Sequence, residues 1–150
     1  MHRIDPATLE TLGKTDLSSY VSVHTATAHH HQDPSSGDIW NIGTKFGRVA
    51  AHVLVKTPTN SDRTSTPIDG TVMVGEVTTD TDNPAYVHSF GMTENYVLIV
   101  EAPLRMNSWE LMKMNWSGKS VAECMRWHKN CPTTVRVVER GSGKEVAGVK

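Results

Sequence analysis

Histidine is the residue type most able to do chemistry in this sequence. Eight histidines occur among 150 residues, and three of them are consecutive. Neutral imidazole is the commonest transition-metal ligand and suits iron, zinc and copper. His29 and His88 each fall at the end of a predicted strand, where a rigid scaffold can present an imidazole to a cavity. They lie 59 residues apart, which matches no local metal motif, so only the tertiary structure could assemble a site from them.

The histidines also have an ordinary structural interpretation. A lone histidine in an apolar strand is more often a hydrogen-bonded core residue than a metal ligand. The pattern alone therefore leaves both interpretations open for His29 and His88. Four other histidines are expected at the surface or in packing, and two more carry no functional signal: His30, His31, His52 and His128 in the first group, His2 and His24 in the second.

The two cysteines offer a weaker candidate site. Cys124, His128 and Cys131 have the ligand types of a structural zinc site, but the spacing C-x3-H-x2-C lacks a matching second pair. We therefore expect no zinc there, and two cysteines do not make a disulfide framework. The sequence also contains no Gly-rich phosphate loop, no GxSxG elbow and no CxxC pair.

The composition bounds the fold and the partners. A chain of 150 residues can form one ordinary domain with a core, so residues 1–150 are expected to be a single segment without separate domains. A net charge of −1 gives no bulk attraction to nucleic acid. No secretory signal opens the sequence, and no apolar run approaches the ~20 residues that cross a bilayer. The expected location is therefore the reducing cytoplasm.

Short strands separated by turns are expected to position the histidines. Residues 21–31 (VSVHTATAHHH) alternate with a period of two, and their β-branched residues favour a strand. The turn sequence QDPSSG then leads into a return strand at 38–42, which predicts a hairpin. Further strands are predicted at 50–56, 71–78, 86–90, 95–102, 133–139 and 145–149, with a polar surface loop at 57–70 and a short helical turn or edge strand at 8–12.

His88 lies in residues 86–107 (YVHSFGMTENYVLIVEAPLRMN), where a Gly-containing turn follows it and the apolar run 96–100 predicts a buried strand. About eight short strands predict an all-β protein, either a sandwich, a barrel or about two four-stranded propeller blades. Residues 105–119 fit no element clearly, and residues 121–127 predict a short helix. The Met- and Trp-rich segment Leu104–Trp116 is either ordinary packing or an apolar lip beside a lipid-facing entrance.

Two motifs resemble the carotenoid cleavage oxygenases, in particular the animal branch that contains beta-carotene oxygenases and the retinoid isomerase of retinal pigment epithelium. The segment YVHSFGMTENYVLIVEAPLRMN is similar to the family block whose HSFG histidine ligates iron, and that histidine falls on His88. Residues 27–43 (TAHHHQDPSSGDIWNIG) are similar to a TAHPH-like block whose first histidine is also an iron ligand, and it falls on His29. The similarity is weakest at 57–70 and after residue 119.

The resemblance implies a fold and a reaction. The family is a seven-bladed β-propeller with four iron-ligating histidines on its axis, so this chain would form about two blades and supply His29 and His88. Bound Fe(2+) would use O2 to cleave one C=C bond of a carotenoid such as beta-carotene into apocarotenoid or retinal aldehydes. No catalytic residue is implied beyond the ligands. Phe90 and the strand at 96–100 would support the site, and Leu104–Trp116 would make peripheral contact with a membrane.

The sequence departs from the family pattern in several places. His30 replaces the family's proline between the motif histidines, no FHH-like motif supplies a third or fourth ligand, and the glutamates that orient the ligands lie outside these residues. We therefore expect an internal piece of such an enzyme or a partial gene product, inactive on its own. Two other functions remain open: a retinoid ester isomerohydrolase on the same scaffold, and a non-catalytic β module that binds apolar ligands.

Overall fold

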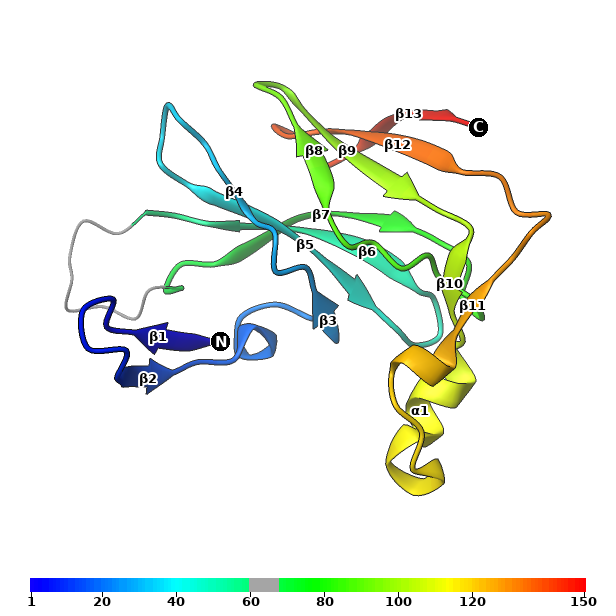
Figure 1. The fold of residues 1–150 in the computed structure, drawn as a ribbon. Helices are drawn as coiled ribbons and strands as arrows, with labels where there is room; N and C mark the ends of the chain where they lie inside the picture. The colour runs from blue at the N-terminus through cyan, green and yellow to red at the C-terminus, as the bar shows by residue number, and fades with distance from the viewer. Residues whose placement is uncertain (60–67) are drawn as a thin grey trace.

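Two antiparallel β-sheets pack face to face in the computed structural model, which describes residues 1–59 and 68–150 (Figure 1). The strands of the first sheet are β3 (Thr25–Ala26), β4 (His31–Gln32), β5 (Ile39–Lys45), β6 (Ala51–Thr57) and β7 (Val72–Thr78). The strands of the second sheet are β8 (Phe90–Met92), β9 (Tyr96–Glu101), β12 (Thr134–Glu139) and β13 (Glu145–Val149). In each sheet the strands follow one another in an up-and-down order, as in a propeller blade.

The centre of the first sheet is β6, which is buried on both faces. Leu54 points into a core cluster shared with the second sheet, whereas Val53 and Val55 pack on the opposite face against Val21 and Val23. A strand covered on both faces needs apolar residues at consecutive positions rather than alternate ones. This explains why the segment AHVLVKT reads as an almost continuous apolar run.

The main core lies between the two sheets. Side chains from β5, β6 and β7 meet side chains from β8, β9 and β12 there, and the buried members are Trp40, Ile42, Leu54, Val77, Phe90, Val97, Ile99 and Val138. Residues 97 and 99 alternate with more exposed neighbours on β9, so this strand buries one face only. The burial of apolar surface between the sheets is the main force that joins them.

Two smaller strand pairs and one helix lie outside the sheets. β1 (His2–Ile4) pairs with β2 (Thr11–Lys14), and β10 (Leu104–Met106) pairs with β11 (Met125–Trp127). The helix α1 (Ser108–Ser117) projects from the body of the sheets (Figure 1). The side chain of Asn107 accepts a hydrogen bond from the Glu110 backbone at its start, and Gly118 ends it with a φ of 68°, where a left-handed residue is needed.

Most of the predicted strands are confirmed. The strands predicted at 50–56, 71–78, 95–102, 133–139 and 145–149 are β6, β7, β9, β12 and β13, each within one residue at either end. The return strand at 38–42 is β5, which continues to Lys45. The ambiguous residues 105–119 form most of β10 and all of α1, and the helix predicted at 121–127 is only a 3₁₀ turn at Ala122–Cys124 before β11. Part of the predicted loop 57–70 lies outside the described residues.

Two predicted strands are wrong, and both contain a candidate ligand. Residues 21–31 do not form one strand, because regular pairing with β5 is limited to the two short strands β3 and β4. Residues 86–89 are not a strand either. Ala85 bridges to Arg105 on β10, and the chain then crosses to pair with β9 only from Phe90 onward. His29 and His88 therefore lie in irregular links beside strands rather than within them.

No helix among residues 1–59 and 68–150 is both long enough and apolar enough to cross a lipid bilayer.

Candidate metal-binding site

The structure brings His29 and His88 together. Their Nε2 atoms are 2.9 Å apart, and their ring centroids are 4.6 Å apart with the ring planes tilted by 58°. Both residues are exposed in this chain, and neither belongs to the buried core clusters. The fold thus brings together two histidines that are distant in the sequence and that the sequence alone could only suggest as a pair.

His29 is held by the link between β3 and β4. The Thr27 hydroxyl accepts a hydrogen bond from the His29 backbone N–H at 3.0 Å, and it also donates one to the backbone carbonyl of His88. The amide of Asn41 on β5 donates to the Thr27 carbonyl at 3.0 Å. Thr27 therefore ties both histidine segments to each other, and Asn41 ties them to the first sheet.

His88 is oriented by Tyr86, which lies two residues earlier in the same extended link. The Tyr86 hydroxyl is 3.1 Å from Nδ1 of His88, on the opposite side of the ring from Nε2. Backbone hydrogen bonds between Tyr86 and Leu104, and between Met106 and Pro84, hold this link against β10. The imidazole is therefore fixed at both its nitrogen atoms.

The donor set fits a shared metal ion. Two imidazole nitrogens in adjacent positions at right angles, each about 2.1 Å from a metal, lie about 3.0 Å apart. The separation of 2.9 Å between the two Nε2 atoms agrees with this value. Neutral imidazole binds through a nitrogen without a proton, so His88 would carry its proton on Nδ1, where the Tyr86 hydroxyl oxygen can accept it. Within residues 1–59 and 68–150, no three His, Cys, Asp or Glu side chains gather as a complete site.

Three further histidines, His30, His31 and His52, lie outside this pair. His31 packs edge-on against Phe90 at 4.6 Å between ring centroids, and its Nε2 is 2.9 Å from the Phe90 carbonyl oxygen. Phe90 thus supports the link that carries His88 from within the core. His52 is fully buried and His30 is exposed, in agreement with the packing and surface roles predicted for them.

A buried polar network joins the two sheets. His52 Nε2 donates to Glu101 Oε1 at 3.1 Å, and the Thr79 hydroxyl donates to the same oxygen at 2.6 Å. Arg136 Nε contacts the other carboxylate oxygen at 3.2 Å. Burial alone would raise the pKa of Glu101, but the hydrogen bonds from His52 and Thr79 and the positive charge of Arg136 outweigh it and lower this pKa to about 2. Glu101 is therefore an ionised group that holds β6, β7, β9 and β12 together.

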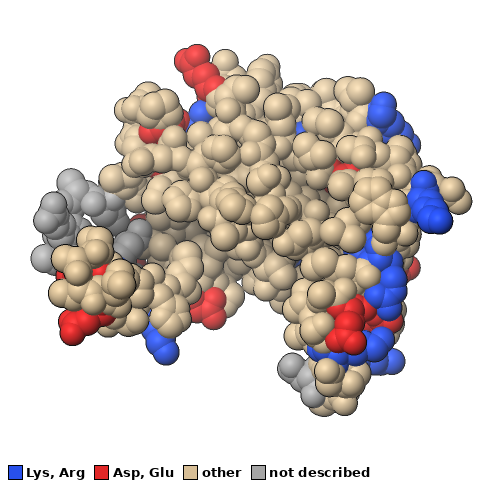
Figure 2. All heavy atoms as spheres, in the orientation of Figure 1, with Lys and Arg blue, Asp and Glu red and all other residues tan. Residues whose placement is uncertain are grey.

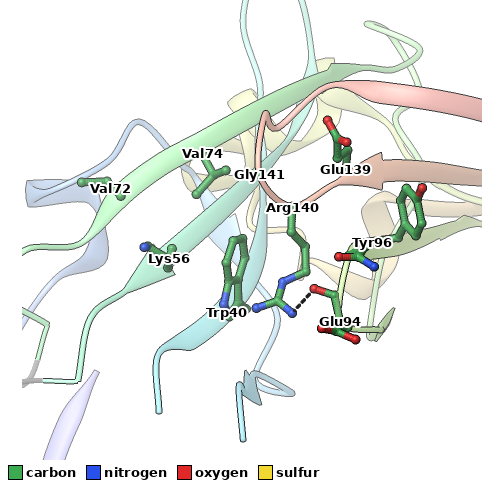
Figure 3. A pocket seen from close by; sticks show the side chains of 10 residues that line it. Trp40, Lys56, Val72, Val74, Glu94, Tyr96, Glu139, Arg140 and Gly141 are labelled. Atoms are coloured by element: carbon green, nitrogen blue, oxygen red, sulfur yellow. Dashed lines mark hydrogen bonds between the residues drawn. The ribbon is translucent and has the colours of Figure 1, made fainter. Parts of the chain in front are cut away.

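A cleft of about 630 Å³ is lined by residues of both sheets (Figure 3). Its lining includes Trp40 of β5, Tyr96 of β9 and Arg140, which follows β12. The β8–β9 turn also lines it, and that turn lies at the far end of β8 from His88. The cleft is therefore distinct from the site where the two histidines meet.

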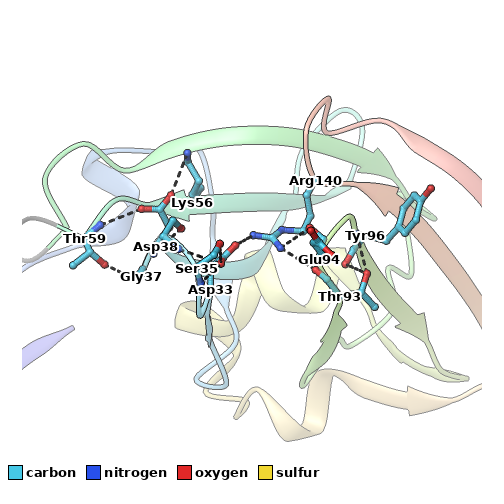
Figure 4. A network of polar contacts seen from close by, with 11 residues as sticks. Asp33, Ser35, Gly37, Asp38, Lys56, Thr59, Thr93, Glu94, Tyr96 and Arg140 are labelled. Atoms are coloured by element: carbon cyan, nitrogen blue, oxygen red, sulfur yellow. Dashed lines mark hydrogen bonds and ion pairs between the residues drawn. The ribbon is translucent and has the colours of Figure 1, made fainter.

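Arg140 spans the two sheets next to this cleft (Figure 4). Its guanidinium pairs with Asp33 in the β4–β5 turn and donates to the carbonyls of Thr93 and Glu94 in the β8–β9 turn at 2.9 and 2.8 Å. It also stacks on the Trp40 ring at 4.5 Å from the ring centroid. Arg140 therefore has a structural role, which is to fix one sheet on the other.

Sequence reasoning singled out His29 and His88 as candidates but did not single out Thr27 and Tyr86, which contact them. A signal was available for Tyr86, because residues two apart in an extended chain lie on the same side, and Tyr86 and His88 have that spacing. No comparable signal marked Thr27, because its partner is a backbone carbonyl 61 residues away.

Comparison with known proteins shows the family of this chain. The sequence model of the family described as retinal pigment epithelial membrane protein (RPE65) matches residues 1–150. The chain belongs to this family. A mitochondrial carotenoid-cleaving dioxygenase of Pongo abelii is 33% identical over an alignment of 150 positions, which covers 99% of this chain and 27% of the relative. A beta,beta-carotene 15,15'-dioxygenase of Gallus gallus is 36% identical over 98% of this chain and 29% of the relative.

Solved structures of two oxygenases have the same fold over this chain. A variant of the Synechocystis apocarotenoid oxygenase superposes on 99% of this chain with a TM-score of 0.68 and 19% identity, and a lignostilbene dioxygenase of Pseudomonas brassicacearum superposes on 93% with a TM-score of 0.65 and 25% identity. The two sheets are therefore part of a β-propeller, and the predicted all-β class is confirmed. The chain spans 29% of the first of these structures and 26% of the second.

Proposed function

We propose that the whole protein is an Fe(2+)-dependent dioxygenase that cleaves a C=C bond of a carotenoid, with His29 and His88 as two of its iron ligands. The observation that carries this proposal is the separation of 2.9 Å between their Nε2 atoms. The family, with relatives named as carotenoid-cleaving dioxygenases, supports the reaction class. Bound iron would activate O2 for the cleavage of one conjugated double bond into two aldehyde or ketone products.

The residues of this chain would hold and orient the ligands. Thr27 fixes the backbones of both histidine segments, and Tyr86 fixes the proton-bearing side of the His88 ring. Two neutral imidazoles leave the charge of the ion uncompensated and leave most of its coordination positions unfilled. We therefore expect the isolated 150-residue chain to bind iron weakly and to have no turnover, with the other ligands supplied by residues outside it.

A second candidate function is isomerisation with ester cleavage of a retinoid. Two observations support this second candidate. One is the name of the matching family, and the other is a relative from Galleria mellonella that is 36% identical and is named carotenoid isomerooxygenase. The same two histidines would serve either reaction, so they do not distinguish them. A non-catalytic module that binds apolar ligands is the third candidate, and it requires no bound iron.

The proposal includes peripheral contact with a membrane through the segment Leu104–Trp116. Most of this segment is α1, which projects from the sheets and leaves Trp109 61% and Trp116 90% exposed. Tryptophan and methionine beside basic residues suit the interface between water and lipid. Such a contact would let an apolar polyene pass from the lipid to the protein without crossing water.

Iron content and reaction products of the full-length protein test the proposed function. The purified protein is expected to contain about one iron per chain and to convert beta-carotene to aldehydes that chromatography separates. His29→Ala and His88→Ala are each expected to abolish both properties. His30→Ala is the matched control, because His30 follows His29 in the sequence and is equally exposed but lies outside the pair, and it should retain both.

The outcomes separate the candidates. Normal iron content in His88→Ala would overturn the ligand assignment. Iron with retinol but no aldehyde, when a retinyl ester is supplied, would support the isomerase. Absence of iron from a folded wild-type protein would favour the binding module.

A further inference from the structure

The side chain of His31 contacts the chain two residues beyond His88. Its Nε2 lies 2.9 Å from the carbonyl oxygen of Phe90, and its ring packs edge-on against the Phe90 ring with 4.6 Å between the ring centroids. A carbonyl oxygen only accepts hydrogen bonds, so Nε2 of His31 carries the proton and is the donor. His31 therefore holds the first residue of β8 by a directed bond as well as by packing.

Both partners of this bond are fixed in the sheets. His31 is half-buried and is the first residue of β4, where it pairs with Trp40 of β5. Phe90 is 6% exposed and belongs to the core between the sheets. A hydrogen bond shielded from water is electrostatically stronger than one at the surface. The contact thus attaches the first sheet to the start of β8, next to the link that carries His88.

His31 and Thr27 attach the two histidine segments on either side of the candidate metal-binding pair. Thr27 lies two residues before His29 and donates to the carbonyl of His88. His31 lies two residues after His29 and donates to the carbonyl of Phe90. Both attachments are made within this chain, so they hold the two Nε2 atoms at 2.9 Å without help from a metal ion. A preorganised site loses less binding free energy to the ordering of its ligands.

We propose that His31 is a positioning residue for the metal site: by holding Phe90 it fixes the segment of His88 and strengthens the binding of a divalent metal ion. The inference rests on the proposed function, which makes His29 and His88 the ligands. His31 donates to a backbone carbonyl rather than to a ligand ring, so it acts through the backbone. The three consecutive histidines then differ in role, because His29 binds the ion, His31 positions the other ligand, and His30 is exposed.

The affinity of the full-length protein for Co(2+) tests this role. Bound metal is removed with a chelator, and Co(2+) is titrated back in competition with a chromophoric chelator. His31→Met removes the donor, and its dissociation constant for Co(2+) is expected to rise about tenfold, as when residues that orient metal ligands are lost. His31→Gln is similar in length but retains an N–H donor, so it should restore most of the affinity. His30→Met, at the exposed neighbouring residue, is the matched control and should bind Co(2+) as wild type does.

Urea unfolding of the metal-free variants separates positioning from general stability. A purely structural role would lower the free energy of unfolding of His31→Met and leave the Co(2+) affinity of the folded protein unchanged. If His31→Met does not fold, as circular dichroism would show, His31→Phe takes its place in the comparison with His31→Gln. That variant keeps a ring against Phe90 and has no N–H donor.

The outcomes distinguish this inference from the proposed function. Wild-type Co(2+) affinity in a folded His31→Met or His31→Phe protein, together with loss of binding in His88→Ala, would overturn the positioning role alone. An equal loss of affinity in His31→Gln and His31→Met would also overturn it, because the N–H donor would then make no difference. Wild-type affinity in His88→Ala would overturn the ligand assignment and this inference with it.

Discussion

Arg140 and Asp33 are 107 residues apart in the sequence, and their ion pair joins the two sheets (Figure 4). Asp33 lies in the β4–β5 turn, where its carboxylate also accepts hydrogen bonds from the Ser35 side chain and backbone. These Ser35 bonds and the Arg140 guanidinium hold the pKa of Asp33 well below its usual range. The strand β4 begins two residues after His29, so the pair also fixes an element close in sequence to one of the candidate ligands.

Arg140→Met should destabilise the full-length protein. The change leaves the Asp33 carboxylate without its cation and removes the hydrogen bonds to two carbonyls of the β8–β9 turn. We expect the melting temperature in differential scanning calorimetry to fall by several degrees. Arg126→Met is the control, because Arg126 is largely exposed and pairs with Glu110 at the surface, where such a pair contributes little. Equal melting temperatures for the two variants would contradict a joining role for Arg140.

Gly75→Ala should be strongly destabilising. Gly75 on β7 meets the β12–β13 turn so closely that a Cβ atom would lie 2.0 Å from the Gly143 carbonyl oxygen. Because a backbone atom is the obstacle, the two sheets would have to separate, at a cost of about 1–3 kcal/mol or more in unfolding free energy. Urea unfolding measures it. Gly13→Ala is the control, because a Cβ at Gly13 would meet no atom within 4 Å. Its free energy of unfolding should stay within about 0.5 kcal/mol of the wild-type value.

The regular strands could be predicted because their residue patterns reflect burial. β6 reads as a continuous apolar run since both its faces are covered, and β9 alternates since one face is covered. The links that carry His29 and His88 also contain apolar and β-branched residues, and for that reason the sequence predicted strands there. Whether a segment forms a strand depends, however, on the strand that lies beside it. Ala85 bridges to β10, where Tyr86 also bonds to Leu104, and pairing with β9 begins only at Phe90, so residues 87–89 cross from one partner strand to the other.

The candidate site was predictable only in its residue types. Two histidines near strand ends indicated a metal site, whereas their meeting depends on the packing of two sheets, which no local pattern specifies. The roles of Thr27 and Arg140 depend on contacts over 61 and 107 residues. The network around Glu101 was invisible for the same reason, because its members come from four separate strands or strand ends.

The double variant Trp109→Ala/Trp116→Ala should weaken membrane association. Both indoles on α1 are exposed to solvent. Glu110 on the same helix forms ion pairs with Lys119 and Arg126, and Figure 2 shows acidic and basic side chains together in this region. We expect a severalfold loss of the fraction of full-length protein that sediments with phosphatidylcholine vesicles. Trp127→Ala, on β11 and also exposed, is the control for a general loss of surface tryptophan. Unchanged sedimentation of the double variant would exclude α1 as the contact.

Glu101 should make the stability of the protein depend on acid pH. The pKa of Glu101 is about 2 in the folded protein, against a value of 4.5 for a glutamate in the unfolded chain. Its ionised form therefore stabilises the fold fully above pH 4.5. As the pH falls from 4.5 toward 2, protonation removes this contribution, which is on the order of 2–3 kcal/mol. Glu101→Gln cannot titrate, so the difference in unfolding free energy between wild type and this variant should be largest at neutral pH and shrink across that window.

Urea unfolding of the full-length protein at a series of pH values measures this difference. The groups that face Glu101 are His52, Thr79 and Arg136, and Arg136 also contacts Glu145. Glu110→Gln serves as the control, because its pairs lie at the surface, and its curve should follow the wild type within about 0.5 kcal/mol. A constant offset between wild type and Glu101→Gln from pH 7 to pH 3 would show that packing, rather than the charge of Glu101, holds the sheets together at this point.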